Sequence, residues 1–336
     1  MFVNIDPYTK IIRLWLVSIF ILVTIIIVVG GLTRLTDSGL SITEWELFKG
    51  IIPPLNINQW DFYFNEYKKI PEFKSINFNM SLDEFKVIYY WEYAHRLIAR
   101  LIGLVSLFPL IIIYIKYKKK LLKDLKFLSI FGLVCFQGFI GWFMVKSGLI
   151  NNTDVSHYRL ASHLSLALIV LSLTFWFILE NLKTDKFTIK FNNNFLHCFL
   201  VVIVIQIILG AFLAGLNGGL LYNSWPDMNG SFFPSDIIEG DLYKFNSLNN
   251  PSVVQFYHRF IAYILIFFLI ILNYHFYKNK IQFKPILILN FAVIFQIILG
   301  IITLITGVKI YYASLHQLGS VFVLTSFLFI YYKNTN

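Results

Sequence analysis

The sequence predicts an all-α integral membrane protein in which eight membrane-spanning helices form two pseudo-symmetric four-helix bundles. Three observations predict this fold: the composition, the number of long apolar runs and an internal repeat. Of the 336 residues, 57% are hydrophobic and only 14% are charged, whereas an ordinary soluble domain carries about 25% charged residues. The composition therefore excludes a typical water-soluble enzyme.

Apolar runs that are long enough to cross a bilayer, roughly 20 residues or more, occur eight times. The first run continues into Gly30-Gly31-Leu32-Thr33-Arg34 without a small-x-small cleavage site, so we interpret it as a spanning helix and not as a signal peptide. The runs lie at residues 13–33, 88–115, 127–147, 160–180, 195–216, 257–277, 286–307 and 311–332.

Basic residues predict the orientation. An even number of spans puts both termini on one side, and lysine and arginine gather at the amino terminus, in the second, fourth and sixth loops and in the tail, which is typical of a cytoplasmic face. The long loops at 35–87 and 217–256 are rich in acids and are expected outside, in a periplasm-like compartment. Because the net charge of +10 is distributed in short clusters, nucleic acid is not expected as a partner.

The sequence of the first outer loop predicts where two helices begin. Ser81 and Glu84 have the spacing of a capping box, so the second spanning helix is expected to begin before the bilayer. A short surface helix, either a lid or an interfacial helix, is expected over residues 58–69. Its predicted cap is Asn58, and its aromatic face carries Trp60 and Phe64.

An internal repeat divides the chain into two halves, residues 1–190 and 191–336, with four spans each. The first and fifth spans align at an offset of 180 residues, and the third helix of each half carries a Gln-x-x-x-Gly pair. Gln206 and Gly210 on the fifth helix have this spacing too. The matched pairs are Gly30 with Gly210, Trp45 with Trp225, Gln137 with Gln296 and Gly141 with Gly300.

Histidines inside the predicted spans indicate a functional site, because an ionisable side chain in a bilayer is costly. Two imidazoles from facing helices can bind an iron from both sides of a porphyrin, and neutral imidazole is a natural axial ligand. Each even-numbered helix carries one such histidine toward its outer end: His95, His163, His258 and His316. We therefore expect two haem iron sites, His95 with His163 and His258 with His316.

Other interpretations explain these four histidines less well. A lone intramembrane histidine usually packs through a hydrogen bond or relays protons, but two in each half at matching positions favour haem. Zinc takes about four ligands, and each pair offers two. Cys135 and Cys198 lie in apolar runs and predict no disulfide or thiol site. The remaining histidines, which we assign no role, are His157 in a loop, His197 at the start of the fifth helix and His275 at the far end of the sixth.

Arginines beside these histidines are candidate ligands for haem propionates, because a guanidinium group binds a carboxylate through two hydrogen bonds. Arg96 and Arg259 directly follow His95 and His258, and Arg159 lies one turn before His163. An interfacial arginine that extends its charge to the membrane surface explains Arg96 and Arg159 equally well.

The two halves differ at one position. Glu92 lies three residues before His95, on the helix face that presents the imidazole, whereas Gln255 has this place before His258. We expect the chemistry in the amino-terminal bundle, with Glu92 as the catalytic acid, and electron delivery in the carboxy-terminal one. A structural ion pair between Glu92 and Arg96 is the alternative and does not exclude catalysis.

Several segments together resemble the haem A synthases of mitochondria and alpha-proteobacteria, and the resemblance covers nearly the whole chain. The segments are Gly30-Gly31-Leu32-Thr33-Arg34-Leu35-Thr36-Asp37-Ser38-Gly39-Leu40-Ser41, Glu84-Phe85-Lys86, Trp91-Glu92-Tyr93-Ala94-His95-Arg96, Tyr158-Arg159-Leu160-Ala161-Ser162-His163, Asn223-Ser224-Trp225-Pro226-Asp227-Met228-Asn229-Gly230, His258-Arg259 and Leu315-His316-Gln317.

The resemblance implies a membrane haem-dependent oxidoreductase that oxidises the methyl group at ring position 8 of haem O to a formyl group, by successive hydroxylation and loss of water. The product would be haem A for cytochrome oxidase. Carried over by position, His95 and His163 would ligate the substrate haem and Glu92 would be the essential acid. The resident haem b, with its iron, would be held by His258 and His316.

The implied partners are haem O as substrate, the membrane lipid, haem O synthase, the assembly of the terminal oxidase, and an electron donor that the motifs do not identify. The first outer loop lacks the cysteine pair of some bacterial relatives, so a thiol–disulfide relay is not expected there.

Two rival functions follow from the same histidines. A non-enzymatic b-type membrane cytochrome would often carry two histidines per helix, stacked across the bilayer, whereas each helix here has one. A haem-handling transporter would need the four histidines but no catalytic group, so the presence of Glu92 disfavours it.

Overall fold

The computed structural model describes residues 6–46, 49–150, 152–237, 240, 242 and 244–335, and no strand occurs among them. Within these residues, eight helices are long and apolar enough to cross a membrane, which confirms the predicted all-α membrane fold. They are α1 (Pro7–Leu35), α4 (Leu82–Leu121), α5 (Leu128–Ile150), α6 (His157–Asn181), α7 (Asn193–Gly215), α8 (Pro251–Lys278), α9 (Lys284–Ile305) and α10 (Ile310–Asn334).

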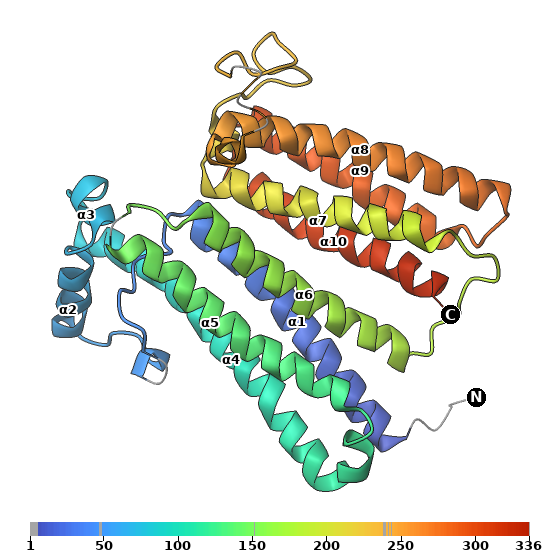
Figure 1. The fold of residues 1–336 in the computed structure, drawn as a ribbon. Helices are drawn as coiled ribbons and strands as arrows, with labels where there is room; N and C mark the ends of the chain where they lie inside the picture. The colour runs from blue at the N-terminus through green and yellow to red at the C-terminus, as the bar shows by residue number, and fades with distance from the viewer. Residues whose placement is uncertain are drawn as a thin grey trace. The chain divides into compact units, whose positions relative to one another are not determined.

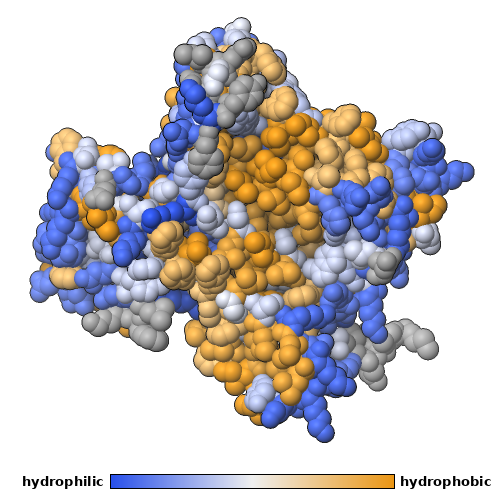
Figure 2. All heavy atoms as spheres, in the orientation of Figure 1, coloured by the Kyte–Doolittle hydropathy of each residue, from blue (hydrophilic) through white to orange (hydrophobic). Residues whose placement is uncertain are grey.

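Large apolar side chains remain exposed along these helices, as a protein surrounded by lipid requires. On α1, for example, Leu14, Ile21 and Ile25 are exposed. On the face shown in Figure 2, hydrophobic residues cover much of the long helices, and hydrophilic residues gather toward their ends. A water-soluble chain would not expose so large an apolar surface.

The chain divides into two compact units between Ile178 and Leu179. In the first unit, α1 packs on α4 and α4 on α5; in the second, α7 packs on α8 and α9 on α10 (Figure 1). Short helices lie in the outer loops: α2 (Ile57–Tyr67), α3 (Pro71–Ser75) and the single turns η1 (Lys49–Ile51), η3 (Gly218–Leu220) and η5 (Phe245–Asn249). The predicted assignment of one haem to each of residues 1–190 and 191–336 stays a prediction.

The predicted helix starts in the first outer loop are confirmed in part. The Ser81 hydroxyl accepts from the Glu84 N–H at 3.3 Å, and the Glu84 carboxylate accepts from the Ser81 N–H at 2.8 Å, so the capping box of α4 is present. The expected cap Asn58 is wrong, because α2 begins one residue before 58. Asn56 is extended and its side chain accepts from the Gln59 N–H at 3.0 Å.

The outer loop has an aromatic core. Trp60 and Phe64, on one face of α2, are each only 7% exposed. Trp60 packs against Tyr89 with ring centroids 5.1 Å apart, and Phe64 packs against Phe85 at 5.0 Å. These contacts attach α2 to the projecting first turns of α4 (Figure 1). The predicted surface helix is therefore docked on α4 through its apolar face.

Glu72 on α3 is buried beside this aromatic core, at 5% exposure. Its Oε1 accepts from the Tyr67 hydroxyl at 3.3 Å and from the Asn77 side-chain amide at 3.5 Å, whereas its Oε2 is buried without a hydrogen-bond partner. Burial raises the pKa of Glu72 to about 8, and the carboxylates of Asp154, Asp37 and Glu92 add to this. At neutral pH this carboxyl is therefore protonated for much of the time.

We expect Glu72→Gln to remove a pH dependence of stability. A carboxyl whose folded pKa is raised binds its proton more tightly in the folded state, so its contribution is complete below the ordinary pKa of 4.5 and is lost as the pH rises to about 8. The variant should match the wild type at pH 5 and unfold at a higher temperature at pH 9. Thermal unfolding in detergent at both pH values measures this. Glu66→Gln, at a carboxylate on the surface of α2, is the control, and an equal difference at both pH values would contradict the prediction.

Candidate functional site

The four predicted ligand histidines meet as two facing pairs, each inside one unit. His95 on α4 and His163 on α6 have ring centroids 6.4 Å apart, with an interplanar angle of 58°. His258 on α8 and His316 on α10 have centroids 6.3 Å apart, with an angle of 76°. A metal held between two imidazoles by bonds of about 2 Å places their centroids roughly 6 Å apart. Both pairs therefore have the separation that two axial ligands of one haem iron require.

A glycine from a neighbouring helix lies against each of the four imidazoles. A β-carbon added to any of them would lie 2.9–3.2 Å from a ring atom, closer than ordinary packing allows. The repeated glycines thus leave room for the histidine rings, which the repeat itself could not reveal. The contacts are Gly30 with His95, Gly141 with His163, Gly210 with His258 and Gly300 with His316.

We expect Gly141→Ala to reduce the haem A formation that the resemblance implies by about 10- to 100-fold, since displacing a group of a reaction site by about 1 Å commonly costs that much. The new methyl group would lie 2.9 Å from Cε1 of His163 and would push the ring away. Haem A extracted from expressing cells measures the effect. Gly138→Ala on the same helix is the matched control, because a β-carbon there meets nothing within 4 Å. Equal yields from the two variants would contradict the prediction.

Glu92 is buried, and both of its oxygens are occupied. Oε1 accepts from Nε and Nη2 of Arg96, at 2.9 and 2.6 Å. Oε2 accepts from the Ser41 hydroxyl and from the Ile42 N–H, each at 2.8 Å. The four donors match the ionised form of the side chain, which only accepts. The ion pair between Glu92 and Arg96, which the sequence offered as the alternative to a catalytic role, is therefore present. The hydrogen bonds from Ser41 and Ile42 connect this pair to the first outer loop.

Arg96 and Arg259 fasten equivalent segments of the two outer loops. Arg96 donates to the main-chain oxygens of Ile42 (2.7 Å) and Glu44 (2.9 Å). Arg259 donates in the same way to the main-chain oxygens of Tyr222 (2.8 Å) and of residues 224 (3.1 Å) and 227 (2.7 Å). Positions 42 and 222, like 44 and 224, differ by the 180 residues of the repeat. The internal repeat therefore extends to individual hydrogen bonds.

The remaining predicted residues have local partners. Gln255, at the place of Glu92, donates its side-chain amide to the main-chain oxygen of Tyr222 at 3.1 Å. Arg159 donates to the main-chain oxygen of Phe143 at 2.8 Å, and its guanidinium group lies 3.8 Å from the centre of that ring. It therefore binds the first turn of α6 to α5.

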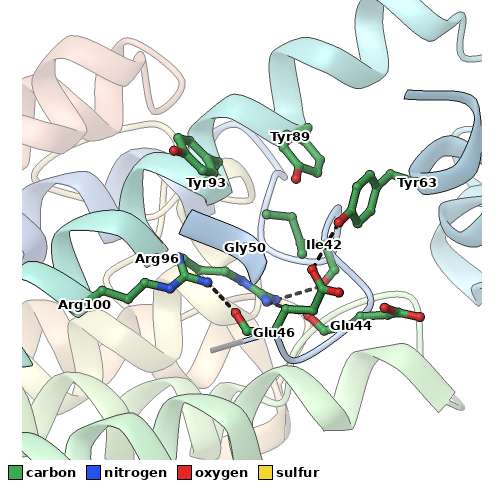
Figure 3. A pocket seen from close by; sticks show the side chains of 9 residues that line it. All are labelled: Ile42, Glu44, Glu46, Gly50, Tyr63, Tyr89, Tyr93, Arg96 and Arg100. Carbon is green, nitrogen blue, oxygen red and sulfur yellow. Dashed lines mark hydrogen bonds between the residues drawn. The ribbon is translucent and has the colours of Figure 1, made fainter. Parts of the chain in front are cut away.

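A small pocket opens beside Arg96 in the first outer loop (Figure 3). Arg100 donates to the main-chain oxygen of Glu46 at 2.7 Å, and the Tyr63 hydroxyl donates to the carboxylate of the same residue at 3.1 Å. Burial, together with this hydrogen bond, raises the pKa of Tyr63 to about 12, so its phenol stays protonated. The lining residues are Ile42, Glu44, Glu46, Gly50, Tyr63, Tyr89, Tyr93, Arg96 and Arg100.

Three glutamines contact the paired histidines, although the sequence assigns them no role beyond the Gln-x-x-x-Gly spacing. The side-chain amides of Gln137 and Gln296 donate to the main-chain oxygens of His163 and His316, at 2.9 and 2.8 Å. Gln206 places its amide nitrogen 3.4 Å from Nε2 of His258. Their position, one helical turn before a glycine that faces the same ring, was the signal in the sequence.

The other histidines lie apart from the two pairs. His157 was predicted to lie in a loop. This prediction is wrong, because His157 is the first residue of α6. His197 contacts the Tyr331 hydroxyl, and His275 contacts the side-chain amide of Asn279. Among the residues that the structure describes, no group of three or more His, Cys, Asp or Glu side chains could hold a metal ion.

The fold and the facing histidines define an all-helical membrane protein with two facing pairs of imidazoles. A family model described as "Cytochrome oxidase assembly protein" matches residues 13–328. A "Heme A synthase" of Pelagibacter ubique is 62% identical over 336 residues, which is all of both chains. A "Heme A synthase" of Rickettsia bellii is 40% identical over 94% of this chain and 96% of its own.

A third relative, the "Heme A synthase" of Agrobacterium fabrum, is 44% identical over 258 residues, which are 76% of this chain and 71% of its own. The chain belongs to this family, the haem A synthases. It is a multi-pass membrane protein.

Proposed function

We propose that the protein oxidises the methyl group at ring position 8 of haem O to a formyl group and so makes haem A for cytochrome oxidase. The observation that carries this proposal is the 62% identity over the whole chain to a relative named "Heme A synthase". The two facing histidine pairs support it, because the reaction has one haem as substrate and a second as resident cofactor.

In the amino-terminal unit, His95 and His163 bind the iron of the substrate haem O, and the carboxylate of Glu92 is the catalytic group. The asymmetry of the two units supports this assignment, since a carboxylate precedes the first histidine pair and a neutral amide precedes the second. A carboxylate can stabilise positive charge that develops on the substrate or accept a proton from it. To accept a proton, Glu92 must release one of its four hydrogen-bond donors.

In the carboxy-terminal unit, His258 and His316 hold haem b, which supplies one-electron transfer when it is bound. Arg259 is proposed to contact a propionate of this haem, because its Nε is buried without a hydrogen-bond partner. On the substrate side, the hydrogen bonds of Arg96 to described residues occupy four of its five guanidinium N–H groups, and the fifth is proposed to bind a propionate. Arg159 is proposed to act beside it.

The protein is proposed to lie in the bacterial inner membrane, with both termini in the cytoplasm and both haem sites toward the periplasm. The lysine- and arginine-rich loops support this orientation. Haem O synthase and the assembling terminal oxidase are the proposed partners that supply the substrate and receive the product.

Pigment analysis tests the proposed function. The protein is expressed in cells that make haem O but no haem A, and the haems are extracted and separated. We expect haem A to appear and haem b to co-purify with the protein. Unchanged haem O with bound haem b would instead indicate a non-enzymatic cytochrome or a haem transporter.

A further inference from the structure

Three of the four paired histidines are contacted by a glutamine, and the fourth is not. Gln137, Gln206 and Gln296 each lie four residues before the glycine that faces the same imidazole. On α1, the residue four positions before Gly30 is Ile26, which matches Gln206 in the repeat. No hydrogen bond joins the His95 side chain to another residue that the structure describes, so one histidine of the amino-terminal pair lacks this contact.

Gln137 and Gln296 contact both the backbone and the ring of their histidines, whereas Gln206 contacts the ring of His258. Nε2 of Gln137 lies 3.2 and 3.3 Å from the two ring nitrogens of His163, and because these distances are nearly equal, the amide lies against the ring and not along one N–H direction. It also donates to the His163 main-chain oxygen. Nδ1 of His316 lies 3.1 Å from the main-chain oxygen of Gln296, so the nitrogen of this ring that could bind a metal is Nε2, which lies 3.5 Å from the Gln296 amide nitrogen.

The orientation of the imidazole ring also differs between the three histidines that a glutamine contacts and His95, which no glutamine contacts. In His163, His258 and His316, the edge that faces the glycine is Cε1 with Nδ1. In His95, which has no glutamine, the facing edge is Nε2 with Cδ2. The ring without a glutamine therefore has a different orientation toward its glycine.

The side-chain oxygens of the same three glutamines are buried without a hydrogen-bond partner, and so is Nδ1 of His258. Buried polar atoms are normally paired. A histidine that binds a metal usually donates its second ring N–H to a nearby acceptor, which fixes the ring, and loss of that acceptor costs about 10- to 100-fold in affinity. Gln206 is the candidate for such an acceptor, because its amide nitrogen lies 3.4 Å from Nε2 of His258 while its Oε1 and Nδ1 of the ring are both unpaired.

We propose that Gln206 is a positioning residue that retains the resident haem, and that Ile26 at the matching place leaves His95 as the exchangeable ligand of the substrate site. This inference rests on the proposed function, in which one haem stays and the other must enter and leave. Both ligands of the carboxy-terminal site are held by glutamines. Of the two ligands of the amino-terminal site, only His163 is.

Transfer of haem to apomyoglobin tests the proposal on the purified full-length protein. Gln206→Ile should start with the bis-imidazole spectrum of the wild type and lose haem b about 10- to 100-fold faster. Gln206→Met, which keeps the chain length but lacks the amide, should do the same and serves if the first variant does not fold. Ile26→Gln should slow the release of haem from the amino-terminal site by a similar factor. Asn273→Leu is the matched control, because it removes an amide that bonds α8 to α9 through Asn290 and contacts no histidine.

Wild-type rates of haem loss in both Gln206 variants would overturn the proposal, and so would equal acceleration by Asn273→Leu. His258→Ala separates this outcome from failure of the proposed function. If that variant lacks haem b while the Gln206 variants keep it at the wild-type rate, only the inference fails. If His258→Ala retains haem b, the proposed ligand set itself is wrong.

Discussion

Replacing His258 with alanine is expected to give a protein that purifies without its resident haem b. The imidazole is one of two proposed axial ligands, and its ring faces that of His316 at 6.3 Å. A methyl group cannot bind iron, so the substitution removes one of the two proposed axial ligands. The haem content should therefore fall from about one resident haem per chain to near zero, measured by the optical spectrum of the purified protein before and after reduction.

His275→Ala provides the matched control, because it removes the same residue type from the same helix. His275 contacts Asn279 near the end of α8 and faces no other histidine of the described chain. We expect this variant to keep its haem b and its spectrum. Full haem content in His258→Ala would contradict the assignment of the carboxy-terminal site.

The spans and the histidine pairs could be predicted from the sequence because their signals are local or repeated. A run of about 20 apolar residues identifies a spanning helix wherever it lies. His95 and His258 recur in matching segments, and one histidine per helix leaves few possible pairings. The structure places these residues in the predicted pairs, although their binding to haem stays a proposal.

The attachment of the outer loops could not be predicted in this way. Arg96 and Arg259 donate to main-chain oxygens, and an oxygen of the main chain has no signature in the sequence. The burial of Glu72 likewise depends on how α3 packs against the rest of its unit, which no local pattern contains. The cap of α2 was wrong because Asn56 and Asn58 are both suitable, and only the backbone at residue 56 decides between them.

Glu92→Gln is expected to abolish haem A formation while both sites still bind their haems. The glutamine has nearly the shape of glutamate but can neither carry the negative charge nor accept the proton, and loss of such a group commonly costs about 100- to 10,000-fold in rate. Haem A and haem O extracted from expressing cells measure the activity, and the spectrum of the purified variant measures binding. Unchanged haem A output would remove the acid from the mechanism.

The structure adds a second consequence of this substitution that must be separated from the first. Because Glu92 accepts from four donors, an amide in its place turns one acceptor into a donor that faces other donors, and the attachment of the loop at Ser41 and Ile42 weakens. Ser41→Ala removes one of these bonds and leaves the carboxylate and its ion pair with Arg96 in place. If Glu92 acts chemically, Ser41→Ala should keep haem A formation within about 10-fold of the wild type, a limit set by the loss of one hydrogen bond of about 1 kcal/mol. If Ser41→Ala abolishes haem A formation as completely as Glu92→Gln does, the role of Glu92 is to hold the loop over the substrate site, and the acid chemistry must be assigned to another group.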